Sequence, residues 1–153
     1  MPQMPKYEEL HTDTVDGYFD EGTRILRVTY QGVLTPDTTR DVYAWIGRLI
    51  ASANGNIHLA LGSIYDFRAV RQFDSHTLST AQKNSTKINR DAELRYHPVA
   101  LVVRNRYQYE YVRLTMKITP QEERKRILYT IEEAEDFIKH FCEKYREFIP
   151  GLP

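Results

Sequence analysis

Apolar residues recur at helical spacing between Pro36 and about Ala53. They would share one face of a helix: Val42, Trp45, Ile46, Leu49 and Ile50. Thr35 suits the N-cap and Pro36 suits the first helical position, while Asn54-Gly55 suits the end. The pattern therefore predicts an amphipathic helix from Pro36 to about Ala53.

A second amphipathic helix is predicted after Thr130, near the end of the chain. Thr130 and Glu133 have the spacing of a capping box, in which each side chain satisfies a backbone amide at the helix start. The apolar residues of its inner face are Ile131, Ala134, Phe137, Ile138, Phe141, Tyr145 and Phe148. Pro150-Gly151 then ends the helix.

Strands are predicted on both sides of Glu21-Gly22. The runs "TVDGYF" and "TRILRVTYQG" are rich in β-branched and aromatic residues, and the second alternates as in a strand, so the pair indicates a hairpin. Three short apolar runs predict further strands at about 57–67, at 99–103 and at 126–129.

Two more helices are predicted from weaker patterns. The stretch "SHTLSTAQKNSTKINRDAEL" has a thin apolar stripe opposite a charged face. The stretch "RNRYQYEYVRLTMKI" is ambiguous, because its tyrosines alternate as in a strand while other apolar residues keep a helical period. A helix is preferred there, because a strand directly after another strand would need a clearer turn signal.

The ambiguous stretch carries two apolar stripes when it is drawn as a helix. One stripe, which we expect to face the sheet, contains Tyr107, Tyr111, Leu114 and Ile118. The other contains Tyr109, Val112 and Met116. If it is exposed, this second stripe is a candidate homodimer interface, because aromatic residues and methionine are enriched at interfaces. The alternative is a helix that is buried on both stripes.

The order of these elements predicts the fold class. Strands that alternate with helices indicate an α/β protein with right-handed crossovers and a mixed, mostly parallel sheet. We expect about five strands and four helices, with the helices mainly on one side of the sheet and the opening hairpin at its antiparallel edge. Residues 1–13 carry two prolines and no period, which predicts a flexible lead-in to a single domain over 14–149.

Composition narrows the possible functions. The 153 residues contain 21 Lys plus Arg and 21 Asp plus Glu, so no net charge draws the chain to nucleic acid or to an anionic membrane. No stretch approaches the roughly 20 apolar residues of a membrane span, and no signal peptide is visible, which predicts a cytoplasmic protein.

Metal and cofactor chemistry have little support in the sequence. The only cysteine, Cys142, has no cysteine partner, and the five histidines (11, 58, 76, 97 and 140) lack close ligand spacing. We therefore expect no metal and no cofactor. No nucleophile–base pair or paired carboxylates stand out either, so we expect no enzyme.

Three motifs in this order resemble the STAS family of anti-sigma-factor antagonists and, within it, the SpoIIAA-like branch. "QGVLTPDTT" resembles a strand that runs into the first helix of the family, and "RKRILYTIEEAEDFI" resembles its closing strand and helix. "IYDFRAVRQFDSHTL" resembles the strand, loop and helix start that carry the family's phosphorylation motif. In that segment Asp66, Val70, Asp74, Ser75 and Leu78 match in register.

The resemblance implies a non-catalytic regulatory module that binds a protein partner through the loop and helix start after the third strand. The candidate residues for partner binding or a phosphate switch are Asp66, Arg68, Asp74, Ser75, His76 and Thr77. The sequence departs from the family at two of them: His76 stands at the acceptor hydroxyl position, and Thr77 replaces a glycine. Ser75 and Thr77 remain the hydroxyls that could accept phosphate, and helix capping is their alternative role.

Two further hypotheses concern a ligand-binding rim and an alternative function. Arg71, Arg104 and Asn105 are expected on the same rim as Asp66 and Arg68, beyond the carboxyl ends of the strands, where open α/β sheets bind ligands. The alternative function is a binding protein for small apolar, lipid-type ligands, with a pocket between helices and sheet, because the chain has eleven tyrosines and six phenylalanines.

Overall fold

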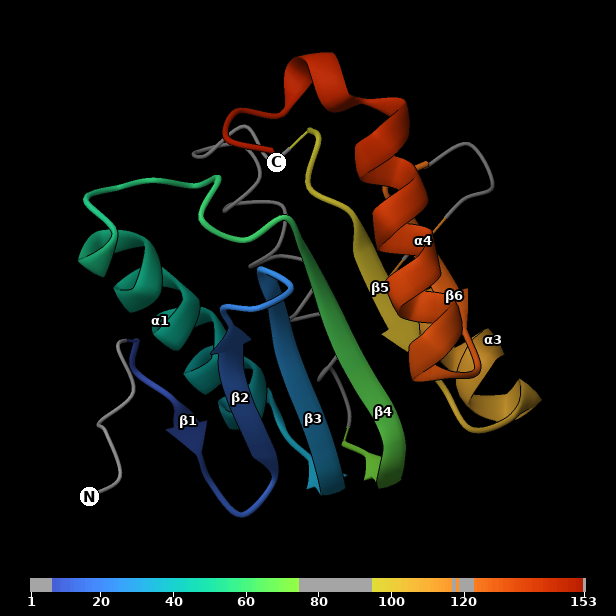
Figure 1. Ribbon diagram of the computed structural model, residues 1–153. Coiled ribbons are helices and arrows are strands. Elements are labelled where there is room, and N and C mark those ends of the chain that lie inside the picture. The colour runs from blue at the N-terminus through green and yellow to red at the C-terminus, as the bar shows by residue number, and fades with distance from the viewer. Residues whose placement is uncertain (1–6, 75–94, 117, 119–122, 153) are drawn as a thin grey trace.

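A computed structural model describes residues 7–74, 95–116, 118 and 123–152 (Figure 1). The elements in chain order are β1 (Leu10–His11), β2 (Val15–Asp20), β3 (Ile25–Leu34), α1 (Pro36–Ser52), β4 (Gly62–Phe73), β5 (Val99–Val102), α3 (Arg106–Thr115), β6 (Lys125–Leu128), α4 (Ile131–Lys144) and a 3₁₀ turn, η1 (Arg146–Phe148). The helix predicted at "SHTLSTAQKNSTKINRDAEL" lies outside the described residues.

The strands form one sheet in which each lies beside its neighbour in the sequence, from β1 to β6. The pairs β1–β2 and β2–β3 are antiparallel, and the pairs from β3 to β6 are parallel. This arrangement confirms the predicted mixed, mostly parallel sheet with an antiparallel hairpin at one edge. The described part of the chain holds six strands rather than about five.

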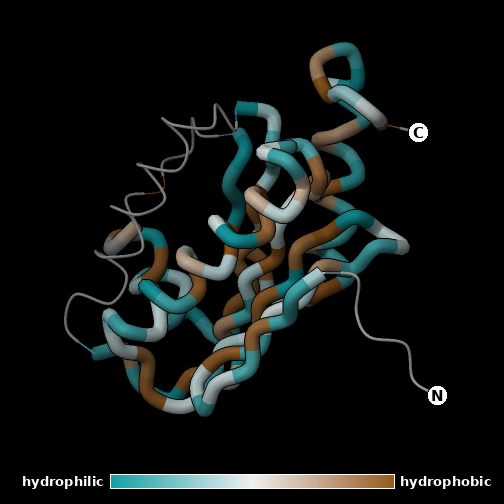
Figure 2. Tube along the Cα trace, turned by 90° about the vertical axis from the view of Figure 1, so that its left-hand side faces the viewer, coloured by the Kyte–Doolittle hydropathy of each residue, from teal (hydrophilic) through white to brown (hydrophobic). Residues whose placement is uncertain are grey.

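Two of the three described helices, α1 and α3, lie on one face of the sheet, in line with the expectation, and α4 covers the other face. Trp45 and Leu49 of α1 pack on one face, together with Val112 of α3. Phe137 and Ile138 of α4 pack on the opposite face. Figure 1 shows α4 in front of β5 and α1 on the far side of the sheet. In Figure 2, hydrophobic segments run along the strands between these layers.

Local signals placed the starts of the two amphipathic helices correctly, whereas α4 ends at Lys144, before the predicted Pro150, and Phe148 is 56% exposed rather than on an inner face. α1 follows Thr35, and Val42 and Trp45 on its apolar face are fully buried. α4 follows Thr130, whose hydroxyl accepts a hydrogen bond from the Glu133 amide at 3.1 Å. Short polar contacts decide where each helix begins, so these boundaries can be read from a few residues.

The long strand β4 begins and ends later than predicted. The apolar run from Ile57 to Leu61 forms turns, and the strand runs from Gly62 to Phe73. At Gly62 a Cβ atom would lie 2.8 Å from Cγ2 of Ile138, so close packing of α4 on the sheet depends on a residue without a side chain.

The described residues before β2 contact the rest of the domain. Leu10 and His11 pair with Gly17 and Asp16 as the edge strand β1, within the segment predicted to be a flexible lead-in. Just before it, the Glu8 carbonyl accepts a hydrogen bond from the Trp45 indole at 2.8 Å. The Glu8 carboxylate also pairs with Arg48 at 2.8 Å. Contacts with α1 therefore hold this segment against the domain.

Gly17 and Trp45 form the closest approach between strand β2 and helix α1. A Cβ atom at Gly17 would lie 2.7 Å from Cζ3 of the Trp45 ring. Trp45 is fully buried and cannot move aside without disturbing the core. The absence of a side chain at Gly17 therefore sets the distance between these two elements.

We expect Gly17→Ala to lower the free energy of unfolding by about 1–3 kcal/mol, the usual cost of overpacking. Gly47→Ala is the matched control, because Gly47 lies in α1 with open space around its Cβ position. It should raise stability by about 0.5–1 kcal/mol, since alanine is the better helix former. Urea denaturation of both variants measures this. Equal effects at the two positions would contradict the close approach.

Candidate functional site

Strand β4 continues beyond the end of its neighbour β5. The two strands pair only from Ser63–Val99 to Asp66–Val102, whereas β3 stays paired with β4 to Leu34–Phe73. Backbone groups on the β5 side of β4 therefore lose their strand partner after Asp66. Buried carbonyls need another donor, because an unpaired one costs free energy.

The side chain of Gln108 supplies that donor. Its Nε2 donates to the carbonyls of Phe67 and Val70 at 3.0 and 3.2 Å, and its Oε1 accepts from the Arg104 amide at 2.7 Å. Gln108 is 2% exposed, so these bonds lie inside the protein. The Asn105 side chain caps α3 by accepting from the Gln108 amide at 3.0 Å. Gln108 thus fixes the start of α3 against the free side of β4.

Asp66 and Arg68 form a local ion pair on β4. Oδ1 of Asp66 accepts from the amide and from Nε of Arg68, both at 3.0 Å, and Oδ2 accepts from Nη2 at 2.9 Å. The carboxylate raises the pKa of the Arg68 guanidinium above its usual value. Nη1 of Arg104 donates to the Arg68 carbonyl at 3.2 Å, which brings two of the three predicted rim arginines together.

Four exposed arginines lie near the part of β4 that extends beyond its pairing with β5. We call Arg68, Arg71, Arg104 and Arg106 the arginine surface. Arg106 pairs with Glu110 at 3.1 Å, and its side chain is 79% exposed. The exposed Asp74 follows at the end of β4, where its amide donates to the Leu34 carbonyl at 2.8 Å. The surface carries more positive than negative charge and suits an acidic partner.

Only part of the predicted switch segment can be placed. Asp66 and Arg68 lie in β4, and Asp74 follows the last residue of that strand, so the segment expected to be a loop after the strand continues the strand instead. Ser75, His76 and Thr77 lie outside the described residues, so their role as partner-binding or phosphorylated residues stays a prediction. Gln108, which organises this region, was not among the residues predicted from the sequence.

Helix α3 faces the core with more of the second stripe than expected, while Tyr111 and Ile118 of the first stripe still pack partly against the core. Val112 and Met116, predicted to be exposed, are buried in the core, and Tyr109 packs partly against it. Tyr107 and Leu114, predicted to face the sheet, are 73% and 63% exposed. Tyr109, Val112 and Met116 therefore do not form an exposed stripe. Both stripes are apolar, and the anchoring of Gln108 on β4 decides which one turns inward.

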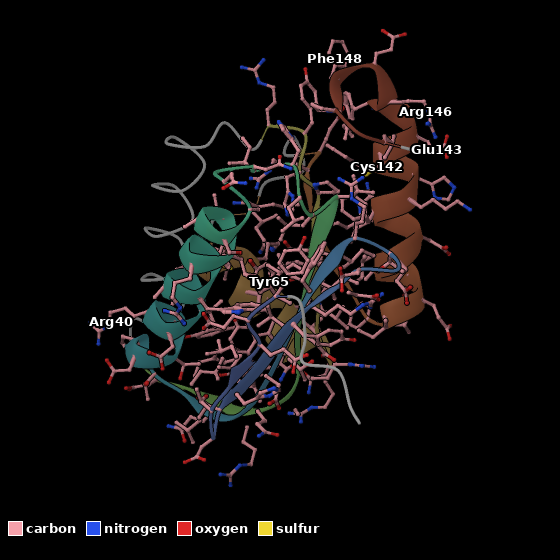
Figure 3. All side chains as sticks on the ribbon, turned by 60° about the vertical axis from the view of Figure 1, so that its left-hand side comes forward. Arg40, Tyr65, Cys142, Glu143, Arg146 and Phe148 are labelled. Atoms are coloured by element: carbon pink, nitrogen blue, oxygen red, sulfur yellow. The ribbon has the colours of Figure 1, made fainter. Side chains whose placement is uncertain are left out.

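A second candidate site is a cavity of about 100 Å³ between α1 and the sheet. The described residues that line it are Phe19, Leu26, Tyr30, Leu34, Thr39, Tyr43, Ile46, Leu49, Ile50, Asn56, Ile57, Leu59, Ala60, Ser63, Tyr65, Phe67, His97, Val99, Leu101, Met116, Arg124 and Lys125. Most of this lining is apolar. Figure 3 shows Tyr65 in the middle of the molecule, between α1 and the strands.

Polar groups meet at one part of the cavity wall. The Ser63 hydroxyl lies 2.7 Å from Nε2 of His97. Nδ1 of His97 is shielded from solvent and makes no hydrogen bond that meets normal geometry within the described structure. Nε of Arg124 donates to the His97 carbonyl at 3.0 Å. A neutral imidazole, one serine hydroxyl and one guanidinium therefore share this corner with Tyr65.

Burial shifts the titration of these groups. Desolvation, helped by the nearby Arg124 charge, lowers the pKa of His97 to about 4. Desolvation raises the pKa of Tyr65 to about 12, against the opposing effects of Ser63 and Arg124. The pKa of Tyr30 is also raised well above its usual value, mainly by burial and further by Tyr65. At neutral pH the three side chains are therefore uncharged.

Arg24 holds the loop that forms one wall of the cavity. Its guanidinium donates to the carbonyls of Leu59, His58 and Gly151 at 3.2, 2.8 and 2.7 Å. These three backbone carbonyls hold the planar guanidinium in one orientation, although none of the acceptors is a carboxylate. The loop after α1 is thereby tied to the β2–β3 turn and to the end of the chain.

Two negative findings apply to the described residues. No group of three or more His, Cys, Asp or Glu side chains there has an arrangement that could hold a metal ion. None of the helices in that part of the chain combines the length and the apolar character needed to cross a membrane.

Comparisons with known proteins identify the fold. No family model and no curated protein sequence matches the chain. Among solved structures, an anti-sigma factor antagonist from Mycobacterium paratuberculosis aligns at 17% identity and a TM-score of 0.54, over 84% of this chain and 97% of the other. An uncharacterised protein with a SpoIIAA-like fold from Shewanella loihica aligns at 16% and 0.54, over 89% and 99%.

A third solved structure agrees with these two. The anti-sigma factor antagonist SpoIIAA in its unphosphorylated form aligns at 13% identity and a TM-score of 0.50, over 87% of this chain and 97% of the other. The chain therefore has the SpoIIAA-like fold, as the sequence motifs indicated. At such low identity the likeness establishes the fold alone.

We expect His97 to stay neutral down to a pH of about 4. Because its pKa is near 6.5 when unfolded, the unfolded chain binds more protons between these values. Stability should therefore fall as the pH drops through that window, by up to about 3 kcal/mol, and not at higher pH. NMR titration of the imidazole and urea denaturation across the window measure both effects.

His97→Asn should remove most of this pH dependence. His140→Asn is the matched control, because His140 is exposed on α4, and it should keep the wild-type slope. An imidazole of His97 that titrates near its ordinary value would contradict the shielded environment.

Gln108→Leu should lower the free energy of unfolding by about 2–4 kcal/mol, because it leaves the carbonyls of Phe67 and Val70 without a donor. Gln72→Leu, at an exposed position on β4, should change it by less than about 0.5 kcal/mol. Urea denaturation compares the two. A loss at Gln72 as large as that at Gln108 would show that Gln108 has no special role.

Proposed function

We propose that the chain is a non-catalytic regulatory module that binds an acidic region of a protein partner at the arginine surface. The observation that carries this proposal is the fixed arrangement of exposed arginines beside β4. Asp66 orients Arg68, and the bond from Arg104 to the Arg68 carbonyl joins α3 to the strand. Side chains held before binding lose less conformational entropy when a partner docks.

The fold supports a regulatory role of a particular kind. Two of the structural neighbours are anti-sigma factor antagonists. By analogy with their names, the partner proposed here is an anti-sigma factor, and the protein acts by contact rather than by catalysis. A cytoplasmic location fits this role. Homodimerisation stays a separate prediction, and Tyr107 and Leu114, rather than Val112 and Met116, are the exposed apolar residues of α3.

The proposed switch would act on the same surface by charge. Asp74 follows the last residue of β4, and Ser75 and Thr77 come one and three residues after it in the sequence. A phosphate on either hydroxyl would add negative charge a few residues from Arg71. It would oppose the binding of an acidic partner at the arginine surface, so phosphorylation is proposed to release the partner.

The apolar cavity favours a second candidate function, the binding of a small apolar ligand. A cavity whose lining is mostly apolar and holds a few polar side chains has the composition of a small-molecule site. The cavity lies between α1 and the sheet. This candidate does not exclude the first, because the arginine surface lies at a different end of β4.

Charge reversal at the arginine surface tests the protein-binding proposal. A photo-crosslinking residue at position 71 is used first in the host cell to capture the partner. Arg71→Glu should then weaken binding of the purified partner by at least about tenfold, because like charges would face each other. The loss should shrink at high salt, which screens exposed charges.

Arg146→Glu is the matched control for this experiment. Arg146 is an exposed arginine on η1, at the opposite end of the molecule from the end of β4 (Figures 1 and 3). It should bind the partner as tightly as the wild type. Equal affinities for the wild type and Arg71→Glu, or equal losses for both variants, would overturn the proposed surface.

A further inference from the structure

We propose that the cavity between α1 and the sheet binds a small apolar carboxylate. Its short chain would lie against the aliphatic lining, and its carboxylate would meet the hydroxyls of Tyr30 and Tyr65 on the side of Arg124. This assigns a ligand class to the cavity and does not depend on the protein-binding function proposed for the arginine surface.

The size and lining of the cavity limit the ligand to a small apolar molecule. Its volume of about 100 Å³ is somewhat below the roughly 150 Å³ of an apolar cavity that admits benzene. Aliphatic side chains from both layers line it, among them Ile46 of α1 and Leu101 of β5. A chain of about four to six carbons matches this space in scale.

The charges of the lining favour an anion over a cation. Arg124 and Lys125 are the charged residues among the described lining residues, and no aspartate or glutamate is among them. Lys125 is the first residue of β6, where it pairs with Val99, and Arg124 precedes it in the chain. The Arg124 charge is close enough to shift the pKa of both Tyr65 and His97. Positive charge inside an apolar wall stabilises a carboxylate more than it would in water.

Tyr30 supplies a donor that the protein itself does not use. Tyr30 is 7% exposed and lines the cavity. Its ring stacks on Phe67 at 4.8 Å, but its hydroxyl makes no hydrogen bond with any described residue. The hydroxyl belongs to a residue of the cavity lining and has no acceptor in the described part of the protein, so it can donate a hydrogen bond to a ligand oxygen there.

Tyr65 lies beside Tyr30 and completes the polar corner. The two rings are stacked with centroids 6.4 Å apart. Burial keeps both phenols protonated at neutral pH, so both can donate hydrogen bonds to an anion. Two O–H donors and a nearby guanidinium suit one carboxylate, and bonds to a charged acceptor are stronger than those to a neutral one.

Three probes with the same five-carbon chain test the charge assignment: pentanoate, pentan-1-ol and pentylammonium. Each is titrated into the ¹⁵N-labelled full chain at neutral pH, and the backbone amides of Ser63 and Leu101 report on the cavity. We expect pentanoate to shift them with an affinity at least about tenfold higher than that of pentylammonium, with pentan-1-ol in between. Equal affinities, or shifts confined to residues outside the lining, would overturn the proposal.

Tyr30→Phe tests the donor without emptying the cavity. Because the Tyr30 hydroxyl has no partner among the described residues, its removal should leave the unfolding free energy of the ligand-free protein unchanged or raised. Affinity for pentanoate should fall about tenfold, since a hydrogen bond to a charged group is lost. Affinity for pentan-1-ol should fall less.

Tyr18→Phe is the control for this variant. Tyr18 lies on β2, is 44% exposed and does not line the cavity. It should bind all three probes as the wild type does. Pentanoate binding that survives Tyr30→Phe unchanged would overturn the role of Tyr30, and a stability loss in that variant would show that its hydroxyl already has a use in the ligand-free fold.

Discussion

The backbone of β4 after Asp66 imposes the constraint on which much of the architecture depends. The strand continues for seven residues beyond its pairing with β5, so its carbonyls on that side need donors that no strand supplies. Gln108 meets this need at Phe67 and Val70. The start of α3, the face that this helix turns inward and the position of Arg104 all follow from that contact.

The same strand carries both candidate sites on opposite faces. Neighbouring residues of a strand point to opposite sides of the sheet, so Tyr65 and Phe67 line the cavity while Asp66 faces the other way and binds Arg68. The cavity lies near the start of β4, and the arginine surface lies toward its end. The strand β4 thus contributes residues both to the apolar cavity and to the arginine surface, and the two sites remain separate.

The sequence predicted features that depend on a few adjacent residues. The hairpin around Glu21-Gly22 and the helices that follow Thr35 and Thr130 are confirmed, since turns and caps are local. The extent of β4 could not be predicted, because the run from Ile57 to Leu61 is as apolar as a buried strand. Only its packing shows that it forms turns.

The inward face of α3 and the polar corner of the cavity had no local signal at all. Tyr107 and Tyr109 are equally plausible core residues on an isolated helix, and only the bonds of Gln108 to β4 separate them. Ser63 and His97 meet across 34 residues of sequence. An isolated serine and histidine at that distance show no pattern, although a buried polar pair among apolar residues is a useful signal once the strands have been placed.

The contact between Trp45 and Gly17 also has a spectroscopic consequence. Trp45 is the only tryptophan in a chain with eleven tyrosines, so indole emission comes from one site in the core, with energy transferred from surrounding phenols. Its indole is bonded to the Glu8 carbonyl. The wavelength of that emission therefore reports whether the segment at Glu8 is docked on α1, and the protein carries its own optical probe of that attachment.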